Sequence, residues 1–97
     1  MAMTETLTGK VALVTGGAKR VGAAICRALH ARGANLMLHH RVSVEEARAL
    51  QHDLNVQRPD SVALIRADLL NSASLPDLVR TTVREFGRLD EIGRAHV

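Results

Sequence analysis

The segment best suited to chemistry is a glycine-rich turn near the amino terminus. Residues 15–22 read Thr-Gly-Gly-Ala-Lys-Arg-Val-Gly and join an apolar run to an amphipathic stretch. Glycine lets the backbone turn sharply and lets a pyrophosphate approach closely, and N–H groups at a helix start favour negative charge. The spacing differs from G-x-G-x-x-G, because Ala18 stands where the second glycine would be, and a Walker loop would need Gly-Lys followed by Ser or Thr. A turn without a ligand is the alternative, but its position after a first strand favours phosphate binding.

Basic and hydroxyl side chains follow the next apolar run. No Asp or Glu occurs from residue 34 to residue 44, and the stretch instead contains His39, His40, Arg41 and Ser43. In a dinucleotide-binding fold, an acid at this place binds the ribose hydroxyls of the adenosine. A guanidinium, a hydroxyl and N–H groups at a helix start fit a 2′-phosphate instead. The sequence therefore predicts NADPH rather than NADH, with Arg41 and Ser43 as phosphate ligands; Ser43 as a helix cap alone is the alternative.

Alternating strands and helices have to position these residues. Apolar runs over residues 10–15, 34–39 and 61–67 predict strands, the first of them covered on both faces. Amphipathic stretches predict helices over residues 20–32, from Ser43 to just before Pro59, and from 71–74 to Gly87. Three strand–helix units with short connections predict a parallel α/β sheet with helices on its faces. This is the amino-terminal half of a doubly wound Rossmann fold, β-α-β-α-β-α, truncated at the start of the fourth strand.

Helical spacing predicts which side chains each helix buries. Cys26 is expected off the apolar face of its helix, without a base that could make it a nucleophile, and His30 and His52 are expected to be solvated. The predicted buried faces are Val21, Ile25, Ala28 and Leu29; Ala47, Leu50 and Leu54; and Leu75, Leu78, Val79, Val83 and Phe86.

Composition excludes several classes of function. The 97 residues suffice for one small domain, and 46% hydrophobic residues allow a packed core. With one Phe and no Tyr or Trp, stacking platforms for single-stranded nucleic acid are excluded, and a net charge of +3 without a basic run does not favour nucleic-acid binding. The lone Cys26 allows no internal disulfide, and the adjacent His39 and His40 point to opposite faces, so no metal site is expected. No apolar stretch is long enough to span a membrane, and residues 1–10 lack the apolar region of a signal peptide, so a cytoplasmic protein is expected.

The turn also resembles that of a known family. Thr15-Gly16, three residues, then Arg20-Val21-Gly22 is similar to the T-G-x-x-x-R-x-G variant of the short-chain dehydrogenase/reductase turn, as in its pteridine reductase branch. The similarity continues through Leu-His-His-Arg-x-Ser, Ala-Asp-Leu at 67–69 and Phe-Gly-Arg-Leu-Asp at 86–90, and covers about residues 8–90. The resemblance implies an NADPH-dependent reductase of a small molecule, a pterin, that forms a homo-oligomer when complete. A reductase of a carbonyl substrate and a nonenzymatic nucleotide-binding fragment are the alternatives.

The resemblance also implies roles for individual residues. The turn would hold the cofactor phosphates, and Arg20 would contact the pterin as well; Arg20 as a solvated residue is the alternative. Asp68 would bind the adenine amino group beside the Leu69 backbone, unless it is only a loop carboxylate. Basic and Ser residues of the family's second loop support Arg41 and Ser43, although Val42 replaces a second basic residue there. The implied cofactor-binding set is Gly16, Arg20, Val21, Gly22, Arg41, Ser43, Asp68 and Leu69.

The family pattern breaks after Asp90. A fourth strand would run on to an Asn-Asn-Ala loop and a Tyr-x-x-x-Lys pair, whereas residues 91–97 read Glu-Ile-Gly-Arg-Ala-His-Val, as a sequencing-library adapter would encode. We therefore expect residues 1–90 to belong to an NADP-binding Rossmann domain and residues 91–97 to be a non-native tail; a frameshift or a shortened paralogue is the alternative. Without tyrosine, the chain has no candidate catalytic residue and is expected to be inactive by itself. An incomplete fourth strand would leave the first strand as an open edge.

Overall fold

Strands and helices alternate along the whole described chain. The structure, a computed structural model, describes residues 6–16, 20–40, 44–67 and 75–94, with the backbone alone at Arg20 and Arg94. In chain order the elements are β1 (Val11–Thr15), α1 (Arg20–Ala31), β2 (Asn35–His40), α2 (Val44–Gln57), β3 (Val62–Arg66), α3 (Leu75–Phe86) and β4 (Glu91–Arg94). Every predicted strand and helix is present, with bounds within a few residues of the prediction.

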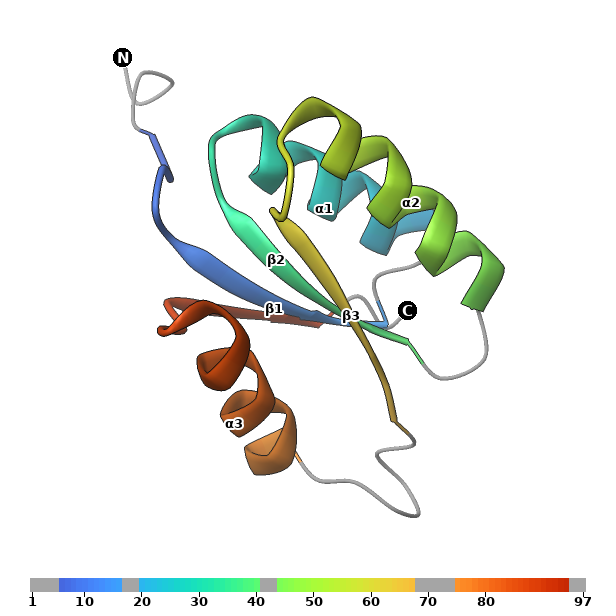
Figure 1. The fold of residues 1–97 in the computed structure, drawn as a ribbon. Coiled ribbons are helices and arrows are strands. Elements are labelled where there is room, and N and C mark those ends of the chain that lie inside the picture. Colours follow the sequence, from blue (N-terminus) through green and yellow to red (C-terminus); the bar gives the residue numbers. More distant parts are fainter. Residues whose placement is uncertain (1–5, 17–19, 41–43, 68–74, 95–97) are drawn as a thin grey trace.

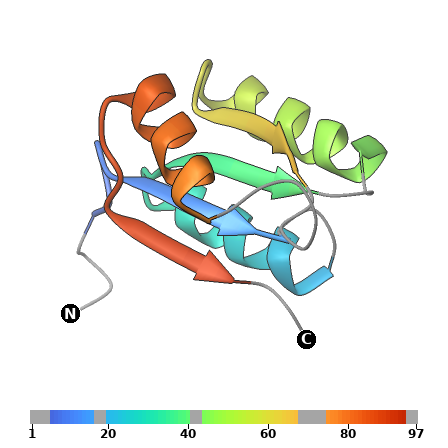
Figure 2. The same ribbon diagram turned by 90° about the horizontal axis from the view of Figure 1, so that it is seen from below.

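The strands of these ranges form one parallel sheet. Their order is β3-β2-β1-β4, and all neighbouring pairs are parallel. Figure 1 shows α1 and α2 on one face of the sheet and α3 on the other, and Figure 2 shows the strand arrows pointing the same way. This arrangement confirms the predicted amino-terminal half of a doubly wound fold.

Two apolar layers fill the space between sheet and helices. Because side chains alternate along a strand, Val14 and Leu38 pack under α1 and α2, whereas Leu13 and Met37 pack under α3. All four are fully or almost fully buried, as expected for strands covered on both faces. On α2 the predicted face is confirmed, since Ala47, Leu50 and Leu54 are buried there.

The predicted face of α1 was rotated by about one residue. Val21 is 52% exposed and Ala28 is exposed, whereas Gly22, Cys26 and His30 are buried. The expectations that Cys26 lies off the apolar face and that His30 is solvated were therefore wrong. A glycine without a side chain and a small cysteine lie on the buried face of α1, where they leave room for the sheet. Burial raises the pKa of the Cys26 thiol to about 11, which makes it a poor nucleophile.

A similar correction applies to α3. Leu78 is buried and Leu75, Val79 and Phe86 pack against the same core layer, but Val83 is 42% exposed and Thr82 is fully buried in its place. Burial of the threonine is tolerated because its Oγ1 donates a hydrogen bond to the carbonyl oxygen of Leu78 at 2.7 Å. A pattern of apolar residues alone cannot reveal a polar group that is satisfied within its own helix.

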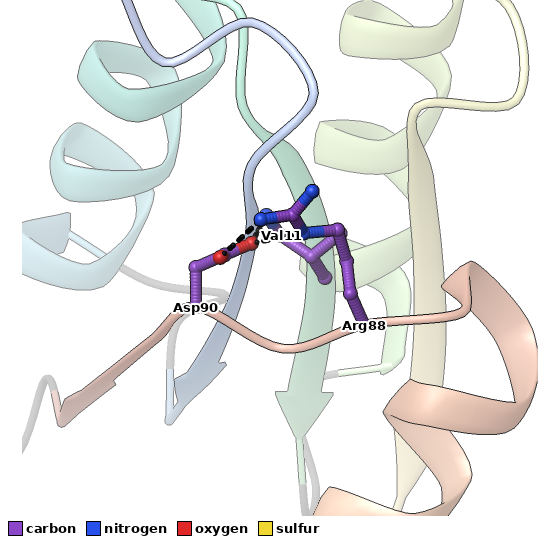
Figure 3. A network of polar contacts seen from close by, with 3 residues as sticks. All are labelled: Val11, Arg88 and Asp90. Carbon is purple, nitrogen blue, oxygen red and sulfur yellow. Dashed lines mark hydrogen bonds and ion pairs between the residues drawn. The ribbon is translucent and has the colours of Figure 1, made fainter.

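The fourth strand is held to the first by Asp90. The Asp90 N–H donates to the Val11 carbonyl at 2.8 Å, and the Val11 N–H donates to Asp90 Oδ2 at 2.9 Å. Arg88 adds two hydrogen bonds to the carboxylate, each of 2.8 Å (Figure 3). Residues 91–94, assigned above to a tail, follow Asp90 as β4 and pair with β1 from Ala12 to Thr15. The first strand is therefore not an open edge, contrary to that expectation.

A polar network lies at the amino-terminal end of β3. His30 Nε2 lies 2.7 Å from Ser61 Oγ, and the Ser61 hydroxyl also lies 2.6 Å from the Arg58 carbonyl oxygen. The Arg58 guanidinium donates to the carbonyl oxygens of His30 and Ala34, and Asn55 Oδ1 accepts the Ser61 N–H at 3.0 Å. Burial, and then the Arg58 charge, lower the pKa of His30, so the ring is neutral near pH 7. The network joins the ends of α1 and α2 to the start of β3.

Candidate cofactor-binding site

The glycine-rich turn begins where β1 ends. Gly16 has φ of 68°, in the left-handed region that disfavours residues with a side chain. Its N–H donates to the His39 carbonyl at 3.1 Å, which extends the β1–β2 pairing by one residue before the chain leaves the sheet. α1 then begins at Arg20. A left-handed glycine followed closely by a helix start gives the geometry that receives a pyrophosphate.

The other predicted segments leave the sheet at the same edge. In the parallel pairing, Thr15 lies opposite His39 and His40 lies opposite Arg66, and the Ala67 N–H donates to the His40 carbonyl at 3.1 Å. The carboxyl ends of β1, β2 and β3 are thus neighbours, as Figure 2 shows. This is the edge where ligands bind in open parallel sheets.

Only some of the predicted cofactor ligands lie among the residues that the structure describes. Gly16 and Gly22 lie at the turn and on the buried face of α1, and Val21 is exposed in the first turn of that helix. The side chain of Arg20 and all of Arg41, Ser43, Asp68 and Leu69 lie outside the described residues. The structure therefore brings together the strand ends that precede these residues, and their contacts with a cofactor stay predictions.

The contacts of His39 were not predicted from the sequence, where it was named only among the basic residues after the second apolar run and as half of a rejected metal pair. His39 is 4% exposed, and its Nδ1 accepts the Gly16 N–H at 3.3 Å. Its Nε2 lies 2.8 Å from the carbonyl oxygen of Ala67. His39 thus contacts the residue that opens the glycine-rich turn and the residue that follows β3. A histidine at the carboxyl end of a strand, next to a glycine-rich turn, was the available signal.

His40, the last residue of β2, has a different environment. It is also 4% exposed, and within the described ranges its Nδ1 is the buried side-chain atom that has no hydrogen-bond partner. Burial lowers the pKa of His40 below its ordinary value, and electrostatic interactions with the neighbouring His39, Arg66 and Arg48 lower it further. Among the described residues, the side chains that contribute to this shift are all basic. The end of β2 therefore combines basic side chains with an unsatisfied polar atom.

These features fit the binding of a dinucleotide. A left-handed Gly16 leaves no side chain in the way of a pyrophosphate, and basic groups around His40 favour an anion at the end of β2.

Among the described residues, no group of three His, Cys, Asp or Glu side chains could hold a metal ion, and none of the helices described is long and apolar enough to span a membrane.

A cavity of about 350 Å³ lies at the opposite end of the sheet. Its lining includes Lys10, Arg32 and Asp90, which flank the amino-terminal ends of β1 and β4. It shares no residue with the glycine-rich turn. The candidate cofactor site therefore rests on the strand ends and on Gly16, and not on this cavity.

Comparison with known proteins identifies relatives of the chain. A family model described as short chain dehydrogenase matches residues 10–93. Pteridine reductase 1 of Leishmania tarentolae is 47% identical over 72 residues, which cover 74% of this chain and 25% of that protein. Versicolorin reductase 1 of Aspergillus parasiticus is 39% identical over 90 residues, covering 93% of this chain and 34% of the relative. Hydroxynaphthalene reductase arp2 of Aspergillus fumigatus is 39% identical over 84 residues, which cover 87% of this chain and 30% of that protein. The chain spans about a quarter to a third of the length of these relatives.

Proposed function

The chain belongs to the short-chain dehydrogenase family, and from this premise we propose that it is the cofactor-binding part of an NADPH-dependent reductase that acts on a pterin. The observation that carries the proposal is the edge formed by three neighbouring strand ends, with a left-handed Gly16 at the first of them. Family membership supports an oxidoreductase with a nicotinamide cofactor. The choice of NADPH and of a pterin goes further and rests on the arguments below.

Preference for NADPH is supported by the charges at the end of β2. Arg48 and Arg66 are close enough to His40 to influence it electrostatically, and no acidic residue lies between residues 34 and 44. An acid at this place would accept hydrogen bonds from the ribose hydroxyls of NADH and would repel a 2′-phosphate. Basic groups have the opposite effect. Arg41 and Ser43, next along the chain, are the proposed phosphate ligands.

The residues of this chain bind and orient the cofactor. When bound, NADPH supplies the hydride that the reduction requires. The N–H groups at the start of α1 would hold the pyrophosphate, and the guanidinium of Arg20 would compensate its charge. Asp68 would accept a hydrogen bond from the adenine amino group. Proton transfer to the substrate would be performed by residues beyond this chain, which contains no tyrosine.

A pterin is the leading substrate because of the arginine in the turn. The similarity to pteridine reductase 1 covers 72 residues at 47% identity, and Arg20 stands where the resembling branch has an arginine. Versicolorin reductase 1 and hydroxynaphthalene reductase arp2, both 39% identical, favour a second candidate, a reductase of a carbonyl compound. Turnover of a dihydropterin by the full-length protein, compared with turnover of carbonyl compounds, separates the two.

Cofactor choice is tested by Arg41→Glu in the full-length protein. Loss of a charge-assisted phosphate contact and added repulsion should weaken NADPH binding by on the order of 2–4 kcal/mol, with a much smaller effect on NADH. Equilibrium titration with both cofactors measures this difference. The matched control is Arg84→Glu, because Arg84 is exposed in the last turn of α3, which leads to the amino-terminal end of β4 and not to the carboxyl ends of β1, β2 and β3. Equal weakening of both cofactors by Arg41→Glu would remove Arg41 from the phosphate site.

A further inference from the structure

The ring of His39 forms a bridge between two segments of the candidate site. On one side Gly16 donates its N–H to Nδ1, and on the other side Nε2 lies 2.8 Å from the carbonyl oxygen of Ala67. A carbonyl oxygen can only accept, so Nε2 must carry the proton. Nδ1 then has a free lone pair and can accept the Gly16 N–H. One neutral tautomer therefore satisfies both contacts.

The bridge adds to hydrogen bonds that the backbone already makes. The Gly16 N–H is shared between the His39 carbonyl at 3.1 Å and His39 Nδ1 at 3.3 Å. The Ala67 N–H donates to the His40 carbonyl at 3.1 Å, while the Ala67 carbonyl accepts from the His39 ring. The peptides that follow β1 and β3 are thus each fixed twice to the end of β2. These hydrogen bonds hold the backbone of Gly16 in its left-handed conformation at the point where the chain leaves the sheet.

The two bridged residues precede segments that would bind opposite parts of the same ligand. Gly16 opens the turn proposed to receive the pyrophosphate, and Ala67 directly precedes Asp68, proposed to bind adenine. We propose that His39 is a positioning residue of the cofactor site, whose neutral ring holds Gly16, at the start of the proposed pyrophosphate turn, and Ala67, before the proposed adenine ligand, in fixed positions relative to each other. This inference rests on the proposed function. It assigns to His39 no contact with substrate or with the reacting atoms.

A purely structural histidine and a positioning histidine differ in what a variant changes. A buried ring that only fills space lowers the free energy of unfolding when it is replaced, but the folded fraction keeps its affinity. A ring that orients the two segments changes cofactor affinity in the folded protein, raising KM for NADPH while kcat changes little. Binding groups that are held in place before the cofactor arrives give higher affinity. When they become free to move, binding must also order them, and this costs free energy.

Three variants of His39 separate the two contacts in the full-length protein. In His39→Asn, the amide oxygen stands near the place of Nδ1 and can still accept the Gly16 N–H. In His39→Gln, the amide nitrogen reaches the place of Nε2 and can still donate to the Ala67 carbonyl. His39→Leu removes both contacts at similar volume. The matched control is His52→Leu, since His52 is exposed on α2.

We expect His39→Leu to weaken NADPH binding by about tenfold, the factor that corresponds to loss of one or two buried hydrogen bonds. His39→Asn and His39→Gln should each recover part of the affinity, and His52→Leu should have no effect. Affinity within twofold of the unchanged protein in folded His39→Leu would overturn the proposal. If His39→Leu does not fold, the Asn and Gln variants decide, because unchanged affinity in both would overturn it equally.

Nuclear magnetic resonance provides an independent test. The ¹⁵N chemical shifts of the His39 ring distinguish a protonated Nε2 from a protonated Nδ1, and the proposal requires protonated Nε2 in the neutral ring. A neutral ring with protonated Nδ1 would overturn it. Gly16→Val separates this proposal from the proposed function. If Gly16→Val leaves NADPH binding intact, the site itself is wrong, whereas loss of binding in Gly16→Val with no effect of His39 variants refutes the role of His39 alone.

Discussion

The two ends of the parallel sheet carry polar groups of different kinds. At the amino-terminal end, the groups of the His30–Ser61–Arg58 network bond to one another, and the Asp90 carboxylate is matched by the Val11 N–H and by Arg88. At the carboxyl end, His40 Nδ1 is buried without a partner in the described part of the chain. Gly16 adopts left-handed φ at the same end.

The difference separates polar groups that stabilise the fold from polar groups that are available to a ligand. A saturated network gains nothing from a further partner, and breaking it leaves buried groups unpaired. An unsatisfied atom and a left-handed backbone are costly in the free protein and are typical of sites where a ligand supplies the missing contacts. We therefore expect changes at the carboxyl end to alter cofactor affinity and changes at the amino-terminal end to alter stability.

The largest effect is expected for Gly16→Val. A branched side chain disfavours left-handed φ and blocks the approach of a pyrophosphate, so NADPH affinity should fall by about a hundredfold or more. Titration of cofactor fluorescence measures the affinity, and circular dichroism should show little loss of secondary structure. Gly87→Val is the matched control, because Gly87 has φ of 83° and a Cβ there would meet no atom within 4 Å. Similar affinities in the two variants would make the Gly16 turn structural only.

Arg58→Met should have the largest effect on stability. Its guanidinium donates to the carbonyl oxygens of His30 and Ala34, which would be left without this partner. The free energy of unfolding should fall by about 2–4 kcal/mol, as for two buried acceptors that lose a partner. Chemical denaturation measures the loss, and Arg84→Met, at an exposed site, should stay within about 0.5 kcal/mol. A change of NADPH affinity in the folded Arg58→Met protein would contradict the separation of the two ends.

Stability should fall in mild acid because of His30. Burial, and then Arg58, lower the pKa of His30 in the folded protein below its ordinary value of 6.5. As the pH falls through 6.5, the histidine of the unfolded chain therefore takes up a proton that the folded protein excludes. The free energy of unfolding should therefore decrease as the pH falls from 7.5 to 5.5, with a slope of at most about 1.4 kcal/mol per pH unit for one proton. His40, whose pKa is lowered as well, adds a contribution of the same sign.

His30→Gln should flatten this slope, because the amide can donate to Ser61 Oγ and does not titrate. His52→Gln, at an exposed position of α2, is the control and should leave the slope unchanged. Denaturation curves at several pH values decide between them. An unchanged slope in His30→Gln would show that the acid sensitivity comes from other groups.

The smallest effect is expected for Asp90→Asn. The amide oxygen can still accept the Val11 N–H, but the charge paired with Arg88 is lost. The Arg88 hydrogen bond, followed by that of Val11, lowers the pKa of Asp90, so its contribution is present above pH 3.8 and disappears as the pH falls through the folded-state value. A small decrease of the melting temperature at pH 7 is expected, and this difference should shrink as the pH falls below 3.8 toward the folded-state pKa of Asp90. Asp53→Asn, which removes an exposed pair with Arg27, should change less.

The sequence by itself determined the order of the elements and the place of the turn. Continuous apolar runs and capping signals are local patterns, and they located β1, α2 and β3 to within a residue or two. The need for glycine at position 16 is also local, because left-handed φ depends on one residue. The ligands proposed at Arg41, Ser43, Asp68 and Leu69 remain predictions from sequence.

Tertiary structure decided which polar side chains are buried and what they contact. His30, His39 and Thr82 look solvent-exposed or neutral in the sequence, since a polar side chain is buried only when a partner distant along the chain, or in its own helix, satisfies it. The partner of His30 is 31 positions away and that of His39 is 28 positions away. Such pairs exist only after parallel pairing has brought β1, β2 and β3 into register, because the pairing alone sets which strand ends are neighbours.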